Sequence, residues 1–99
     1  MVDVFELARR SGVRIEYADL GAWGSCELRS EYDPHDAVIR VNTRLLQALP
    51  PAQALRVAAL AVAHELYHHR EACGEVPRLR DRVRREDAAD AFARSLLQT

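Results

Sequence analysis

The alternation of apolar and polar positions predicts helices at both ends of the chain and short strands between them. An amphipathic helix is expected over residues 2–10, with Phe5, Leu7 and Ala8 on its inner face and Gly12 after its end. Alternating apolar and polar residues then indicate a run of strands. Three strands are expected, at residues 13–17, 25–32 and 36–42, with turns at 19–24 and 33–36 and a helical turn at 43–49.

The longest predicted helix begins at Pro51 and stops near Gly74. It is rich in alanine and leucine, which favour helix, and beyond Arg56 it is apolar on all sides. Such a helix is typical of the middle of a domain rather than its surface. A last helix is expected over residues 81–97, with Asp81 as its N-cap.

These elements predict one α+β domain, residues 1–99, in which a small, mostly antiparallel, three-stranded sheet packs against the two long helices. The formal net charge is −1, which favours no direct nucleic-acid partner. The first residues lack the basic start and continuous apolar run of a signal peptide, and no apolar stretch is long enough to span a bilayer. We therefore expect a cytoplasmic protein without a membrane partner.

The long helix contains the sequence His64-Glu65-Leu66-Tyr67-His68, which reads HExxH. Four residues are slightly more than one helical turn, so both imidazoles leave the same face and can converge on one ion. Glu65 lies roughly 100° further round, where it can reach a metal-bound water and take its proton. A histidine pair at this spacing also occurs on solvated helices. On a buried helix, however, these side chains are costly unless a metal satisfies them.

The last helix carries an acidic pair beside its apolar stripe. The stripe consists of Ala89, Phe92, Ala93, Leu96 and Leu97. One turn before it lies Glu86, and Asp90 follows four residues later along the edge. Both acids could point to water and pair with Arg82 or Arg94 at helical spacing. Alternatively, Glu86 is a third metal ligand, and Asp90 orients a ligand histidine through its other ring nitrogen.

Taken together, the two motifs resemble those of the ImmA/IrrE family of metallopeptidases, which are gluzincin-like. The family pattern Glu-x-x-Ala-(Asn/Asp)-x-Phe-Ala-x-x-Leu-Leu is matched at every fixed position by residues 86–97. The resemblance covers nearly the whole chain, including the opening helix and the strand before the long helix. It implies a Zn²⁺ site with ligands His64, His68 and Glu86, and Glu65 as the catalytic residue.

We therefore expect a zinc-dependent metalloendopeptidase that cleaves a specific protein. By the resemblance alone, that protein would be a transcriptional repressor of the helix-turn-helix type. A weaker option is a general peptidase. The alternative from another class is a non-hydrolytic, zinc-containing binding module of a toxin–antitoxin or phage-regulation pair. The basic side chains other than histidine are all arginine and alanine is frequent, which suggests a GC-rich bacterial genome.

Further expectations concern the surroundings of the zinc site. The strand at 36–42 is the candidate sheet edge for an extended peptide substrate. His69, about 100° away from the ligand stripe, is expected at the surface. Three residues could stabilise an oxyanion, although each is more readily explained as structural or solvent-facing: Tyr32, His35 and Tyr67.

The two cysteines and the arginines before Glu86 can be explained without a functional role. Cys26 and Cys73 are too few for a disulfide framework, so reduced thiols are expected, with metal ligation as the lesser alternative. Five arginines crowd the approach to Glu86, at positions 78, 80, 82, 84 and 85. Interleaved acids favour a solvated, salt-bridged loop. If this patch is functional, it would steer a protein substrate rather than bind DNA.

Overall fold

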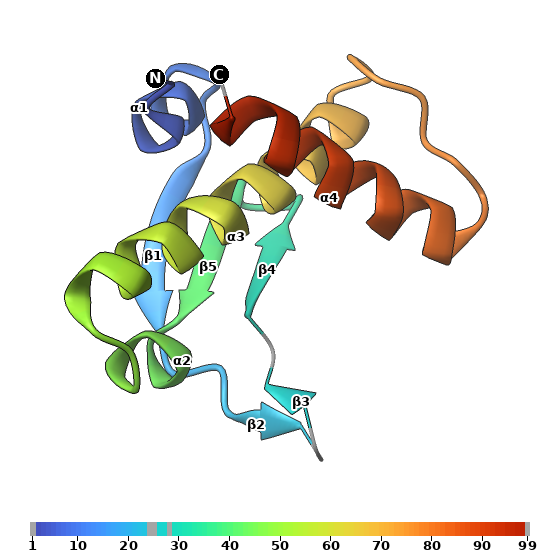
Figure 1. Ribbon diagram of the computed structural model, residues 1–99. Coiled ribbons are helices and arrows are strands. Elements are labelled where there is room, and N and C mark those ends of the chain that lie inside the picture. The colour runs from blue at the N-terminus through green and yellow to red at the C-terminus, as the bar shows by residue number, and fades with distance from the viewer. Residues whose placement is uncertain (1, 24–25, 28, 99) are drawn as a thin grey trace.

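A three-stranded mixed sheet lies at the centre of the fold (Figure 1). The computed structural model describes residues 2–23, 26, 27 and 29–98. The strand order is β1 (Arg14–Ala18), β5 (Val38–Asn42), β4 (Ser30–Asp33). β5 runs parallel to β1 and antiparallel to β4, so that Ile39 lies opposite Ile15 on one side and Tyr32 on the other. The predicted α+β class with a three-stranded sheet is confirmed.

The strand order corrects two expectations about the sheet. One of its two strand pairs is parallel, so the sheet is mixed rather than mostly antiparallel. The segment predicted as the edge forms β5, which is the central strand. Its residues Val38, Ile39 and Val41 are almost fully buried, as expected for a strand covered by neighbours on both sides. The edge beside the candidate site is β4 instead.

The strand expected over residues 25–32 is divided. Its first part contributes β3 (Cys26–Glu27), which pairs with β2 (Ala22–Trp23) in a separate two-stranded hairpin. Its second part is β4, and the turn expected at 33–36 joins β4 to β5 as predicted. Residues 24, 25 and 28 lie outside the described part of the chain. In Figure 1 the β2–β3 hairpin extends away from the sheet and the helices.

The helices form where the apolar pattern predicts them. α1 (Val4–Arg10) is capped by Asp3, α2 (Thr43–Gln47) follows β5, α3 (Pro51–Ala72) begins with proline in its first turn, and α4 (Arg82–Leu97) is capped by Asp81. α3 contacts the sheet, α1, α2 and α4, which explains why it is apolar on all sides. None of the helices within residues 2–23 and 29–98 combines the length and apolar character needed to cross a membrane.

The core lies between α3 and the sheet and continues to α1 and α4. Leu66 and Val62 on α3 are fully buried, as is Ile39 on β5. Ala93 supplies the close approach of α4 to the same cluster. This packing fixes α3 between the edge of the sheet and α4, which sets where its polar side chains meet the other elements.

Candidate metal centre

Two imidazoles lie together on the central helix. His64 and His68 are one turn apart on α3, with their ring centroids 5.1 Å apart. Their side chains are only 18% and 12% exposed, because α4 packs against this part of α3. The helical spacing therefore places two nitrogen donors on one face, in a position that is largely shielded from water.

α4 brings the carboxylate of Glu86 to this pair. Its Oε2 lies 2.8 Å from His64 Nε2, and its Oε1 lies 3.3 Å from His68 Nε2. In a tetrahedral zinc site with bonds of about 2.0–2.2 Å, ligand atoms lie about 3.3 Å from one another. The two distances from Glu86 to the imidazoles are thus close to the separation that ligands of one small cation require.

The other ring nitrogen of each histidine faces a different carboxylate. His64 Nδ1 lies 2.7 Å from Asp90 Oδ1, and His68 Nδ1 lies 2.6 Å from Glu71 Oε1. An ionised carboxylate only accepts hydrogen bonds, so each Nδ1 carries a proton, and in the neutral form of each ring the lone pair lies on Nε2. Both lone pairs then face the Glu86 carboxylate. Only a proton or a cation between them relieves the repulsion.

Glu71 is a member of the site that the sequence analysis missed. Its side chain is 2% exposed, and Arg85 on α4 donates two hydrogen bonds to it, at 3.2 and 3.1 Å. Burial alone would raise the pKa of Glu71, but hydrogen bonds from Arg85 and His68 outweigh it and lower the pKa below its ordinary value. The carboxylate stays ionised. Its position three residues after His68 was the available signal.

Glu65 lies against the same group from the side of the sheet. Its side chain accepts a hydrogen bond from Ser30 Oγ at 2.7 Å, and the residue is 7% exposed. Burial raises the pKa of the Glu65 carboxyl above its ordinary value, although the Ser30 hydrogen bond and the histidines act in the opposite direction. The result is a carboxylate that is more basic than one in water. Ser30, at the start of β4, was not identified from sequence.

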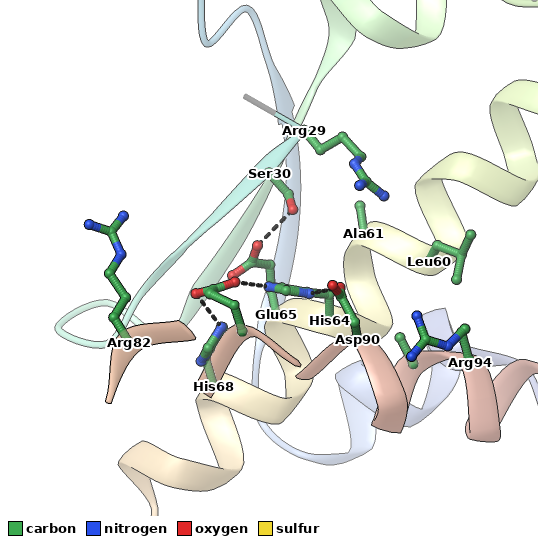
Figure 2. Close-up of a pocket in the computed structure, with 12 residues that line it drawn as sticks. Arg29, Ser30, Leu60, Ala61, His64, Glu65, His68, Arg82, Asp90 and Arg94 are labelled. Atoms are coloured by element: carbon green, nitrogen blue, oxygen red, sulfur yellow. Dashed lines mark hydrogen bonds and ion pairs between the residues drawn. The ribbon is translucent and has the colours of Figure 1, made fainter. Parts of the chain in front are cut away.

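An open pocket of about 530 Å³ is lined by His64, His68, Glu65, Glu86, Asp90 and Ser30 (Figure 2). In Figure 2 the two histidines and Glu65 point toward one another, with Ser30 above them and Asp90 beside His64. None of the three oxyanion candidates lines this pocket. His35 is 93% exposed in the turn, Tyr67 packs on Phe92, and Tyr32 binds another histidine.

That other histidine, His69, is buried, which corrects the expectation of a surface position. It is 7% exposed. Its Nε2 lies 3.0 Å from the carbonyl of Ser11, which can only accept, so Nε2 carries the proton. Tyr32 therefore donates its hydroxyl to Nδ1 at 2.7 Å. The face of α3 that lies about 100° from the ligand stripe is covered by β4 and the end of α1, so His69 connects three elements.

The arginines before Glu86 form fewer ion pairs than expected. Of the five, Arg85 pairs with Glu71, and no ion pair joins the other four to a carboxylate of the described residues. Among the cysteines, Cys73 is an exposed free thiol outside the candidate metal group, with its Sγ 3.6 Å from His69 Nε2. The side chain of Cys26 lies outside the described part of the chain.

Comparison of the chain with models of protein families, with curated proteins and with solved structures finds no match. What the geometry defines is therefore a class of site. His64, Glu65 and His68 have the HExxH spacing, and one potential ligand atom from each lies within 4.8 Å of the others. These three side chains form a group that can hold a metal ion.

Proposed function

We propose that the protein is a zinc-dependent metalloendopeptidase. The observation that carries the proposal is the arrangement of His64, His68 and Glu86. Two imidazole Nε2 atoms, on rings whose opposite nitrogens each contact a carboxylate, face a third carboxylate from another helix. Such a set has no internal proton to share when the rings are neutral, and a divalent cation satisfies all three.

The donor set favours zinc over the harder divalent ions. Calcium and magnesium take oxygen ligands, whereas two imidazoles and one carboxylate are a common set for catalytic zinc. When bound, zinc supplies a Lewis acid that polarises a peptide carbonyl and makes water more acidic. We assign His64, His68 and Glu86 as the ligands. Glu65 also lies near these ligands. It directly follows His64 on the helix and is hydrogen-bonded to Ser30, and both features favour a different role.

We assign Glu65 as the general base and acid. Ser30 holds its Oε2, so Oε1 is the oxygen assigned to take a proton from the attacking water. The same carboxyl then gives that proton to the amine that leaves when the peptide bond breaks. Burial, which raises the pKa of Glu65, makes it a better base for this step near neutral pH.

Asp90 and Glu71 are assigned as positioning residues for His64 and His68. Each accepts the Nδ1 proton of one ring, which keeps the Nε2 lone pair directed at the ligand position. The resemblance of the two motifs to the ImmA/IrrE family supports a protein substrate, such as a helix-turn-helix repressor. That substrate rests on the resemblance alone.

The test separates metal binding from hydrolysis. Zinc-loaded wild type and Glu65→Gln are incubated with a peptide library, cleavage is followed by mass spectrometry, and zinc is measured on the same samples. We expect Glu65→Gln to keep its zinc and to lose cleavage by at least about a hundredfold, the scale of general acid–base catalysis. Glu75→Gln, on the exposed loop after α3, should cleave like wild type.

Two results would oppose the proposal. If Glu65→Gln cleaved as well as wild type, Glu65 would not be the base. If zinc-loaded wild type produced no cleavage beyond that of Glu65→Gln, the site would be that of a non-hydrolytic binding module.

A further inference from the structure

Three arginines line the pocket of the candidate metal centre and have no acidic partner there. Arg29 precedes β4, Arg82 is the first residue of α4, and Arg94 lies three turns further along the same helix. Within the described part of the chain, no ion pair joins any of the three to a carboxylate. Other arginines of the chain do form such pairs: Arg9, Arg10, Arg40, Arg44, Arg70 and Arg85.

Two of these arginines have a carboxylate at helical spacing in the sequence. Arg82 is four residues before Glu86, and Arg94 is four residues after Asp90, a spacing at which opposite charges usually pair on a helix. Both carboxylates turn to the histidines instead, with Glu86 on both Nε2 atoms and Asp90 on His64 Nδ1. The candidate metal centre thus leaves the guanidinium groups available to a ligand.

The arginines lie on both sides of the centre. Figure 2 shows Arg82 on one side of the histidines, Arg94 on the other, and Arg29 above them near Ser30. Arg82 and Arg94 are separated by about 18 Å along the axis of α4, at 1.5 Å per residue. An extended peptide advances about 3.3 Å per residue, so five or six residues cover that distance. A peptide centred on the histidines would therefore reach an arginine at each end.

The charge of the pocket favours an anionic occupant. Its three guanidinium groups are balanced by the carboxylates of Glu65, Glu86 and Asp90. A bound divalent cation would leave an excess of two positive charges in a concave site, where the field is focused. The free carboxylates of an acidic peptide match this excess.

We propose that this pocket selects peptide segments with acidic side chains on both sides of the bond placed at the metal centre. This inference rests on the proposed peptidase function, whose substrate class it specifies. A peptide is favoured over a nucleic acid because Glu86 and Asp90 lie between the arginines, where a continuous phosphate backbone would be repelled. The formal net charge of −1 adds no wider basic surface.

Binding of two matched peptides tests the inference without depending on hydrolysis. The probes are a fluorescein-labelled octapeptide with two glutamates at each end of an alanine–leucine centre, and the same peptide with glutamine in place of glutamate. Each is titrated into zinc-loaded Glu65→Gln protein and followed by fluorescence anisotropy. We expect the glutamate peptide to bind at least about tenfold more tightly, and the difference to shrink in high salt.

Single substitutions then identify the arginines. In the same background, Arg82→Ala, Arg29→Ala and Arg94→Ala should each weaken the glutamate peptide by about three- to fivefold, the scale of one exposed ion pair. They should leave the glutamine peptide unchanged. Arg84→Ala, two residues from Arg82 but not in the pocket lining, is the matched control and should bind both peptides like its parent.

Equal affinity for the two peptides, or equal loss in Arg84→Ala, would overturn the inference. Tighter binding of a single-stranded oligonucleotide than of the glutamate peptide would also overturn it, in favour of a nucleic-acid site. Preference for the acidic peptide in a protein that cleaves nothing would uphold the binding preference and refute the peptidase. Cleavage without enrichment of acidic residues around the cut bonds would uphold the peptidase function and refute the acidic preference.

Discussion

Each histidine of the candidate metal centre uses its two ring nitrogens for different partners. Nδ1 donates to a carboxylate, Asp90 for His64 and Glu71 for His68, and Nε2 faces Glu86. The tautomer of each ring is therefore set by its neighbours rather than by a metal. A tautomer set by neighbouring carboxylates would reduce the reorganisation that binding of a metal ion requires.

Glu71 is the sharpest test at this scale, because it holds His68 and is itself held by Arg85. We expect Glu71→Ala to lower zinc affinity by about 10- to 100-fold, the usual cost of losing an orienting partner. It should also lower the free energy of unfolding by about 1–3 kcal/mol, because buried polar groups lose their hydrogen bonds. Competition with a chelator measures the first effect, and urea unfolding measures the second.

The matched control is Glu75→Ala, whose carboxylate is 62% exposed and lies 3.8 Å from Arg70. It should leave both quantities near the wild-type values. Unchanged zinc affinity in Glu71→Ala would show that His68 needs no such support.

Among the elements, the helices were predictable and the strand order was not. Helical periodicity and end signals placed α3 and α4 within a few residues, because these signals are local. The order of strands depends on pairing between β1 and β5, which are separated in the sequence by β2, β3 and β4. Nothing in a strand's own sequence says which distant strand will pair with it. The β-branched residues Val38, Ile39 and Val41 were the available signal for the burial of β5, which was expected to be an edge strand.

The candidate site was predictable only where it lies on helices. The HExxH spacing predicted His64, Glu65 and His68 as site residues. The motif on α4 predicted Glu86 and Asp90. Ser30 and the burial of His69 depend on how β4 passes α3, and periodicity along one helix cannot supply that. The sequence shows which face a residue occupies but not what covers that face.

Asn42 shows how one buried polar side chain joins several elements. At the end of β5 it is fully buried, its Oδ1 accepts from the backbone N–H of Leu20 and Arg44, and its Nδ2 donates to the carbonyl of Gly21, each at 3.1 Å. We expect Asn42→Ala to lower the free energy of unfolding by about 1–3 kcal/mol, because backbone groups lose partners. Urea unfolding measures this loss.

Gln47→Ala, at an exposed position on the adjoining α2, is the matched control and should change stability by less than about 0.5 kcal/mol. An equally stable Asn42→Ala protein would mean that water replaces all three hydrogen bonds.

For the molecule as a whole, a metal ion would connect the two longest helices. A chain of 99 residues buries a limited core, so one cross-link between α3 and α4 would contribute appreciably to its stability. The same link would place the pocket arginines of α4 and the edge strand β4 around one centre. Folding and substrate selection would then depend on the same three ligands.

Zinc content per chain, measured on dialysed wild type and Glu86→Ala, tests this central claim most directly. Asp87→Ala, an exposed neighbour on α4, is the control. We expect one zinc ion per chain in wild type and in Asp87→Ala, and a large loss in Glu86→Ala, because the Glu86 carboxylate faces the Nε2 atoms of both imidazoles. Full zinc occupancy in Glu86→Ala, or none in wild type, would contradict the account.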